Sequence, residues 1–204
     1  AVDLGEGVIL AGCTLWTDMN KGRDAWAVGR GMNDFLGAIC IEDREGIRAH
    51  DGSYYSRRFR PEDAVKIFNK SIRFLSRTAD ANKGKTVVVA THHAPSLQGI
   101  DRQHLSGAGP GINAGYYTPL EEFIEAHPSI RWWCHGHTHL RKAYRIAQCH
   151  VVSNARGYIG REHSADVFDP DCWFDPVTGE RKDPGNSDAP EDVEQVLEPL
   201  DNNF

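Results

Sequence analysis

The apolar residues of this chain fall into short runs that are separated by glycine, proline and charged residues. Runs of about four to eight residues rich in valine and isoleucine are typical of buried strands, whereas apolar residues three and four positions apart indicate a helix. These patterns predict strands at residues 7–14, 85–91 and 130–134, and a hairpin made of residues 142–146 and 149–154.

Two helices are predicted with defined starting points. Pro61 and the two acidic residues after it suit the positive end of a helix dipole, and the helical spacing continues to Ala81, before a glycine. Thr118 and Glu121 match a capping box that opens a second, shorter helix. A weaker helical segment is expected at residues 32–39. Strands alternating with helices place the chain in the α/β class.

The composition changes along the chain and divides it into two parts. Residues 1–168 are expected to form one domain, whereas residues 169–204 carry five prolines and an excess of acidic over basic residues. Such a segment buries too little apolar surface to order fully, so we expect an acidic, proline-rich tail with a short helix at residues 191–197. Trp173 and Phe174 are the apolar residues that can fix its start to the domain.

Charge and cysteine content exclude some classes of function. The formal net charge of the 204 residues is −6, which argues against non-specific nucleic-acid binding. No apolar run approaches the roughly 18 residues of a membrane span, and no signal peptide is evident. The five scattered cysteines favour reduced thiols in a cytoplasm. Five arginines in one loop-rich region are interpreted as a solvated face, with contact to an anionic substrate as the weaker alternative: Arg44, Arg48, Arg57, Arg58 and Arg60.

Half of the ten histidines lie in two short segments that each follow an apolar strand. His92 and His93 follow the strand at residues 85–91, and the segment from His135 to His139 has a histidine at every second position. Turns at strand ends are suited to directing imidazole nitrogens at one metal ion, and alternate residues project the same way. The two segments together therefore predict a metal site.

Single residues near these segments have simpler interpretations. Gly136 is expected to let the backbone approach closely in the turn. Cys134 is a possible soft ligand, although a small buried residue is the better interpretation. The other histidines taken singly are expected to be hydrogen-bonded structural residues: His104, His127 and His163.

The segments His92-His93-Ala94-Pro95 and Gly136-His137-Thr138-His139 resemble the late motifs of calcineurin-like metallophosphoesterases of the bacterial and phage type. The resemblance runs from about Val8 to Phe168. It implies a partial four-layer α/β/β/α sandwich and hydrolysis of a phosphomonoester or phosphodiester by a hydroxide activated at two divalent ions (Mn, Fe, Zn, Co or Ni). By the family pattern, His92 and His137 bind one ion and His139 binds the other.

The chain lacks the early motifs of that family: Asp-x-His, Gly-Asp-x-x-Asp and Gly-Asn-His. We therefore expect it to hold only the C-terminal part of the fold, the rest being lost by truncation, by an incomplete gene or by residence on another chain. The general acid belongs to the missing part, so no catalytic residue is assigned here. Weaker substrate-binding candidates are His93, Asn154 and Arg156. Trp16 and Asp18 are candidates for the pocket mouth, although a packed tryptophan is favoured.

Two alternatives remain at the level of the sequence. The spacing of His135, His137 and His139 superficially fits the histidine-triad pattern of nucleotide hydrolases, but the residues between them fit poorly and His92 is left unexplained. The other alternative is a non-catalytic or inactive fragment that keeps three metal ligands. The expected partner is a phosphate-ester substrate, without a membrane, and neither the substrate nor the oligomeric state follows from the sequence.

Overall fold

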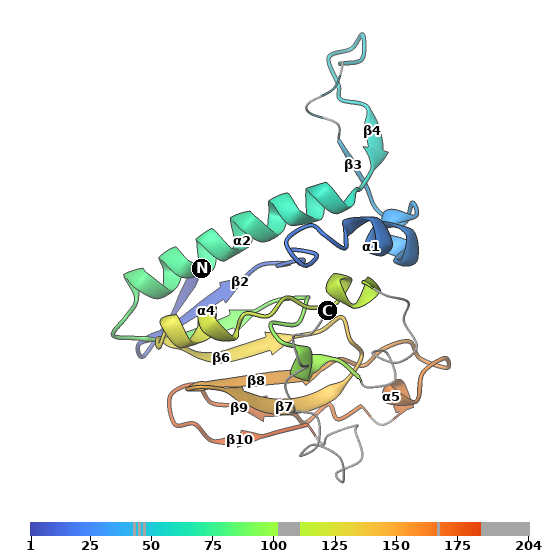
Figure 1. Cartoon of the computed structure of the whole chain (residues 1–204). Helices are drawn as coiled ribbons and strands as arrows, with labels where there is room; N and C mark the ends of the chain where they lie inside the picture. The colour runs from blue at the N-terminus through green and yellow to red at the C-terminus, as the bar shows by residue number, and fades with distance from the viewer. Residues whose placement is uncertain (43, 45, 47, 102–110, 167, 185–204) are drawn as a thin grey trace, which may run out of the picture.

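A six-stranded sheet forms the centre of the computed structural model, which describes residues 1–42, 44, 46, 48–101, 111–166 and 168–184 (Figure 1). The four inner strands are parallel, and the two outer strands pair antiparallel with their neighbours. The predicted strands and the hairpin are therefore confirmed. In spatial order the strands are β1 (Val2–Gly5), β2 (Val8–Gly12), β5 (Thr86–Ala90), β6 (Ile130–His135), β8 (Cys149–Asn154) and β7 (Arg141–Ile146).

The helices cover one face of this sheet. The longest is α2 (Pro61–Ala81), which has the bounds that the sequence predicts, and it is joined by α1 (Ala25–Gly31) and α4 (Glu121–Ala126). Trp133 of β6 is fully buried in this core, together with side chains of all three helices. Among the helices that the structure describes, none combines the length and the apolar character needed to cross a membrane.

The opposite face of the sheet has a smaller apolar cluster. Val8, Val88 and Trp132 pack there, and the Phe174 ring stacks on Trp132 with 4.3 Å between ring centroids. Phe174 belongs to a two-stranded hairpin of β9 (Trp173–Phe174) and β10 (Arg181–Lys182). The segment after residue 168 is thus attached to the sheet through Phe174, while the helix expected at residues 191–197 lies outside the described residues.

One expected helix is wrong, and another is present but starts two residues later than expected. The helical segment expected at residues 32–39 contains only a 3-10 turn, η1 (Asn33–Phe35), and the regular helix α1 precedes it. Helix α4 starts after Leu120, because the Thr118 hydroxyl accepts a hydrogen bond from the Asp18 backbone N–H at 3.0 Å instead of capping the helix. The remaining short helices are η2 (Leu97–Gly99), η3 (Ile112–Gly115) and α5 (His163–Asp166).

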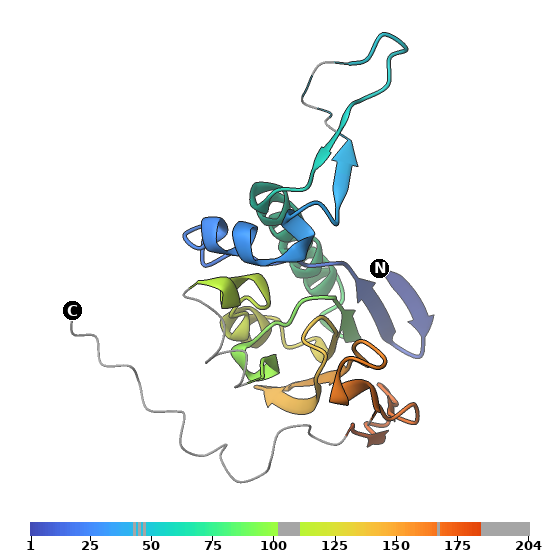
Figure 2. The same cartoon turned by 90° about the vertical axis from the view of Figure 1, so that its right-hand side faces the viewer.

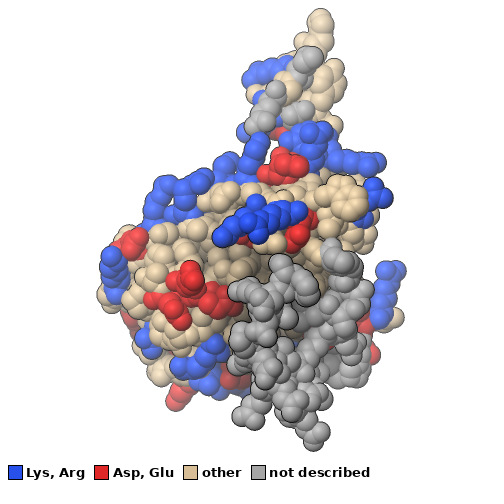
Figure 3. Space-filling model, viewed as in Figure 1, with Lys and Arg blue, Asp and Glu red and all other residues tan. Residues whose placement is uncertain are grey.

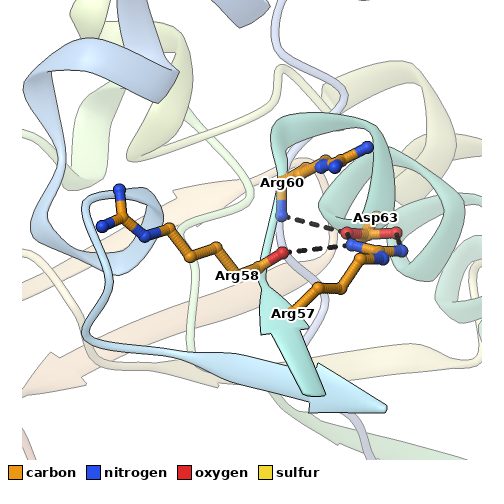
Figure 4. A network of polar contacts seen from close by, with 4 residues as sticks. All are labelled: Arg57, Arg58, Arg60 and Asp63. Carbon is orange, nitrogen blue, oxygen red and sulfur yellow. Dashed lines mark hydrogen bonds and ion pairs between the residues drawn. The ribbon is translucent and has the colours of Figure 1, made fainter. Parts of the chain in front are cut away.

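A hairpin of β3 (Cys40–Glu42) and β4 (Ser56–Arg58) projects from the body near the start of α2 (Figures 1 and 2). Three of its arginines have local partners. Arg57 makes a two-pronged contact with Asp63 at 2.6 and 2.9 Å, and Figure 4 shows this network at the start of α2. Arg44 bonds Glu42, and Arg48 donates to the Tyr54 hydroxyl. Arg44 and Arg48 are exposed, as a solvated face requires, whereas Arg57 is a largely buried structural partner of Asp63.

Candidate metal centre

Both histidine segments lie at the same edge of the sheet, because β5 and β6 are adjacent parallel strands. Parallel strands present their carboxyl ends together, so the residues that follow them meet. Two backbone hydrogen bonds join the segments: Thr91 N donates to Cys134 O at 2.9 Å, and Gly136 N donates to His92 O at 3.0 Å. The backbones of the two segments therefore lie side by side, as expected.

His92 and His137 face one another directly. His92 Nε2 lies 3.1 Å from His137 Nδ1, and the ring centroids are 4.8 Å apart. Two nitrogens bound to one ion at about 2.0–2.2 Å and at angles of about 90–110° are separated by roughly 2.9–3.5 Å. The observed separation lies within that interval, so the pair suits one shared ion as well as a direct hydrogen bond.

His139 is fixed by a partner that the motif does not contain. Its Nδ1 atom donates to Glu162 Oε2 at 2.8 Å, and the same oxygen accepts the Tyr158 backbone N–H at 2.9 Å. A carboxylate that accepts one ring N–H of a histidine leaves the lone pair of the other ring nitrogen for a metal. Glu162 was missed by the sequence reasoning because no local pattern links it to a turn 23 residues earlier.

Burial favours the neutral form of His92, His93 and His137. It lowers the pKa of His92, and it lowers the pKa of His137 to about 3, with repulsion from His92 and His139 adding to the effect. His93 follows the same rule, since burial and then the neighbouring His137 and His92 hold its pKa well below the usual value. Neutral imidazole is the form that binds a metal ion. At neutral pH these rings therefore offer nitrogen lone pairs without first losing a proton.

His93 lies behind this pair rather than in front of it. Its side chain is 1% exposed, its ring lies 4.8 Å from Trp16, and its Nδ1 donates to Thr14 O at 3.3 Å. The Nε2 atom consequently carries a lone pair, and it has no hydrogen-bond partner in the described structure. A lone pair suits a cation or a donor better than a phosphate oxygen, which weakens the expected role of His93 in substrate binding.

The other two substrate-binding candidates make structural contacts. The Asn154 amide nitrogen donates to Asp169 O at 2.8 Å, and its side-chain oxygen has no partner among the described residues. Asn154 lines a hollow of about 530 Å³ with Cys134, His135 and Gly136, beside the histidine turn. Arg156 lies over the Phe168 ring at 5.7 Å. Asn154 remains near the site, and Arg156 is engaged by an aromatic ring.

The remaining candidates have the simpler roles. Trp16 is a packed core residue, as favoured, and lies 4.7 Å from the Phe59 ring. Asp18 accepts the Asn20 N–H and so caps a turn. Burial raises the pKa of Cys134 to about 11, so it stays a protonated thiol and a poor ligand. His127 bonds to Ser76 and to the Phe123 carbonyl, as expected of a structural histidine.

The fit of these residues to a metal ion is partial. The facing nitrogens of His92 and His137 suit it, and so does the buried, unpartnered Nε2 atom of His93. However, no three histidine, cysteine or carboxylate side chains form a complete ligand set within the described part of the chain. His139 lies near this pair, since its charge helps to lower the pKa values of His92 and His137. Its Nδ1 atom, however, is directed at Glu162.

Comparison with protein families finds no family model that matches this chain, and comparison with curated proteins finds no match. The histidine cluster and the motifs that form it are therefore the features that indicate a function.

Proposed function

We propose that this chain is part of a metal-dependent phosphoesterase of the calcineurin-like type, whose remaining ligands lie outside it. The observation that carries the proposal is the 3.1 Å approach of His92 Nε2 and His137 Nδ1 across the ends of two parallel strands. On this proposal the sheet is one layer of an α/β/β/α sandwich, and the protein is cytoplasmic. The five free cysteines support the reducing compartment.

Each residue of the cluster has a defined task in this proposal. His92 and His137 hold one divalent ion through their facing nitrogens, and His139 is directed toward a second ion, with its Nδ1–H fixed by Glu162. A pair of such ions supplies a hydroxide nucleophile at neutral pH and neutralises charge on a phosphoester. His93 packs behind His137 with ring centroids 4.4 Å apart and limits the positions that the His137 ring can adopt.

Metal titration tests the proposal. Titrating the chain with Co²⁺ while following ligand-field absorption and heat is expected to show one site per chain. His137→Ala should weaken it at least tenfold, because one of two facing nitrogens is lost. His50→Ala removes an exposed histidine of the projecting hairpin and should leave the affinity unchanged.

An assay of hydrolysis separates the enzyme from its alternative. With only imidazole ligands the chain should hydrolyse chromogenic phosphomonoesters and phosphodiesters poorly, and restoring the early family motifs should produce Mn²⁺-dependent activity. Full metal-dependent activity that survives His137→Ala would contradict the proposal.

A non-catalytic metal-binding fragment is the second candidate. It is favoured by the lack of a complete ligand set among the described residues. It predicts Co²⁺ binding without activity even when the early motifs are restored. The histidine-triad alternative is less supported, because His135 is buried and its Nδ1 is bonded to the Gly136 carbonyl.

A further inference from the structure

A second polar hollow lies at the opposite edge of the sheet. It has a volume of about 680 Å³ and is bounded by the starts of β5 and β6, the loop after α2 and the β9–β10 turn. The histidine cluster follows the other ends of β5 and β6, so strands about 15 Å long separate the two regions. Glu6 is the one acidic residue that lines this hollow in the described structure. Six basic side chains line it: Lys83, Lys85, Arg131, Arg145, His150 and Arg181.

A row of cross-strand neighbours forms the floor of this hollow. Trp132 of β6 pairs with His150 of β8, which pairs in turn with Arg145 of β7. The Trp132 and His150 rings stack with 4.8 Å between centroids, and the Arg145 guanidinium contacts His150 Nε2. Burial, followed by the charges of Arg145 and Arg181, lowers the pKa of His150. A neutral His150 therefore accepts from Arg145 and fixes the direction of its guanidinium.

The charges around the hollow are only partly compensated. Lys83, Lys85 and Arg181 have carboxylate partners at 3.3, 2.7 and 2.8 Å. Arg131 and Arg145 have no carboxylate partner among the residues that the structure describes. Two guanidinium groups without a carboxylate partner thus lie close enough to His150 to lower its pKa, and an anion bound by both would reduce their mutual repulsion.

We propose that this hollow binds a phosphate-bearing anion through Arg131 and Arg145. Guanidinium groups match phosphate oxygens in a two-pronged geometry, which ammonium groups do not provide. The volume falls within the range of about 300–1,000 Å³ that is typical of small-molecule sites, so a phosphorylated small molecule fits better than a bare ion. The site is independent of the histidine cluster and of any phosphoesterase activity.

Inorganic pyrophosphate is the probe for this site. Titration into the metal-free chain at about 100 mM salt, followed by calorimetry and by backbone amide NMR, should show saturable binding. The amides of Lys83 to Thr86 and of Arg131 should shift. Arg131→Gln with Arg145→Gln should weaken binding at least tenfold, and circular dichroism should show that the double variant is folded.

Two controls separate this site from general charge effects and from the histidine cluster. Arg73→Gln with Arg77→Gln removes the same charge from two exposed arginines of α2 and should leave the affinity unchanged. His137→Ala should also leave it unchanged. Equal weakening in the α2 double variant, loss of binding in His137→Ala, or full affinity in the Arg131 and Arg145 double variant would overturn the proposal.

The source of the phosphate is decided by a parallel titration with a single-stranded oligonucleotide. Tighter binding of the oligonucleotide than of pyrophosphate, lost in the Arg131 and Arg145 double variant, would assign the phosphate to a nucleic acid. Weaker binding of the oligonucleotide would assign it to a small molecule, in agreement with the net charge of −6.

Discussion

Backbone strain in the candidate site is carried by its histidines and not by its glycine. His137 and His139 have φ values of 63° and 53°, in the left-handed region that costs L-residues roughly 1–2 kcal/mol each. A Cβ atom added at Gly136 would lie 3.7 Å from His92 Nδ1 and 3.9 Å from His92 O, which is ordinary contact. The close backbone approach expected at Gly136 is present, since its N–H donates to His92 O at 3.0 Å, but a Cβ atom would fit there as well.

Gly136→Ala is predicted to leave stability nearly unchanged, within about 0.5 kcal/mol, because neither space nor φ requires glycine there. Urea unfolding measures this change. Gly111→Ala is the contrasting variant, since Gly111 has a φ of 84° and a Cβ there would lie 3.1 Å from Asp24 Oδ1. A loss at position 136 as large as that at position 111 would contradict the argument.

With the early family motifs restored, Glu162→Gln is predicted to weaken binding of the second Co²⁺ or Mn²⁺ ion, at His139, by about tenfold and to leave the ion at His92 and His137 unaffected, because the amide holds the His139 Nδ1–H less firmly than the carboxylate does. Isothermal titration calorimetry gives the affinity. Glu180→Gln, an exposed acid in the β9–β10 turn, is the control for a change of one charge. Unaltered affinity in Glu162→Gln would show that Glu162 does not support a ligand.

The pair of Arg57 and Asp63 predicts a pH dependence of stability. Hydrogen bonding to Arg57 lowers the pKa of Asp63, against an opposing effect of burial. A carboxyl group whose pKa is lower in the folded state stabilises the fold above the unfolded-state pKa of about 3.9. This stabilisation is lost as the pH falls through the folded-state pKa. The free energy of unfolding should therefore decrease below about pH 4, and Asp63→Asn should lower it by ~1–2 kcal/mol at neutral pH.

Urea titrations at about pH 7 and pH 3 test this prediction. Asp63→Asn should show a smaller decrease than the parent chain, because its side chain cannot be protonated. Asp80→Asn, at an exposed position paired with Lys83, should behave as the parent chain does. An equal decrease in all three proteins would rule out the contribution of Asp63.

At the scale of elements, local signals predicted α2, missed α1 and placed the start of α4 two residues too early. The start of α2 is signalled by Pro61 and the two acidic residues after it, and its end by a nearby glycine, so its bounds followed from local sequence. Helix α1 contains Gly29 and Gly31, which favour a break by propensity. Close packing accounts for glycine at position 31, because a Cβ atom there would lie 2.2 Å from the Ile112 side chain. Similarly, only the fold brings Asp18 to the Thr118 hydroxyl.

The same limit applies to the candidate site. The approach of His92 and His137 was predictable, because both follow apolar runs that become neighbouring parallel strands. The Glu162 contact and the burial of His93 depend on side-chain packing between distant segments, for which the sequence has no periodic signal.

The stack of Phe174 on Trp132 attaches the β9–β10 hairpin to the sheet. Phe174→Ala is predicted to reduce the free energy of unfolding by about 2 kcal/mol, since a half-buried ring leaves the Trp132 face. Trp173→Ala removes a neighbouring ring that is 51% exposed and should cost less than about 1 kcal/mol. Thermal unfolding of both variants measures the difference, and equal losses would show that the stack is not the attachment.

At the scale of the whole molecule, the net charge conceals an uneven surface. Figure 3 shows basic side chains along α2 and the projecting hairpin, and a separate acidic patch over α4. On α2 the basic residues recur on one face at intervals of three and four positions: Lys66, Lys70, Arg73 and Arg77. Like charges at this spacing destabilise a helix slightly, so tertiary burial of the opposite face must hold α2 in place.

The order of the strands also dictates when the sheet can form. β2 pairs with β5, and Val8 lies opposite Thr86, so this contact closes a loop of 78 residues that includes the whole of α2. Closing this loop costs conformational entropy before the strand pairing can stabilise the fold. Sheets with long-range parallel pairing fold slowly for this reason. A nascent chain emerging from the ribosome therefore carries β2 without its parallel neighbour until Ala90 has been synthesised, and until then the apolar strand depends on β1 and on α2 for cover.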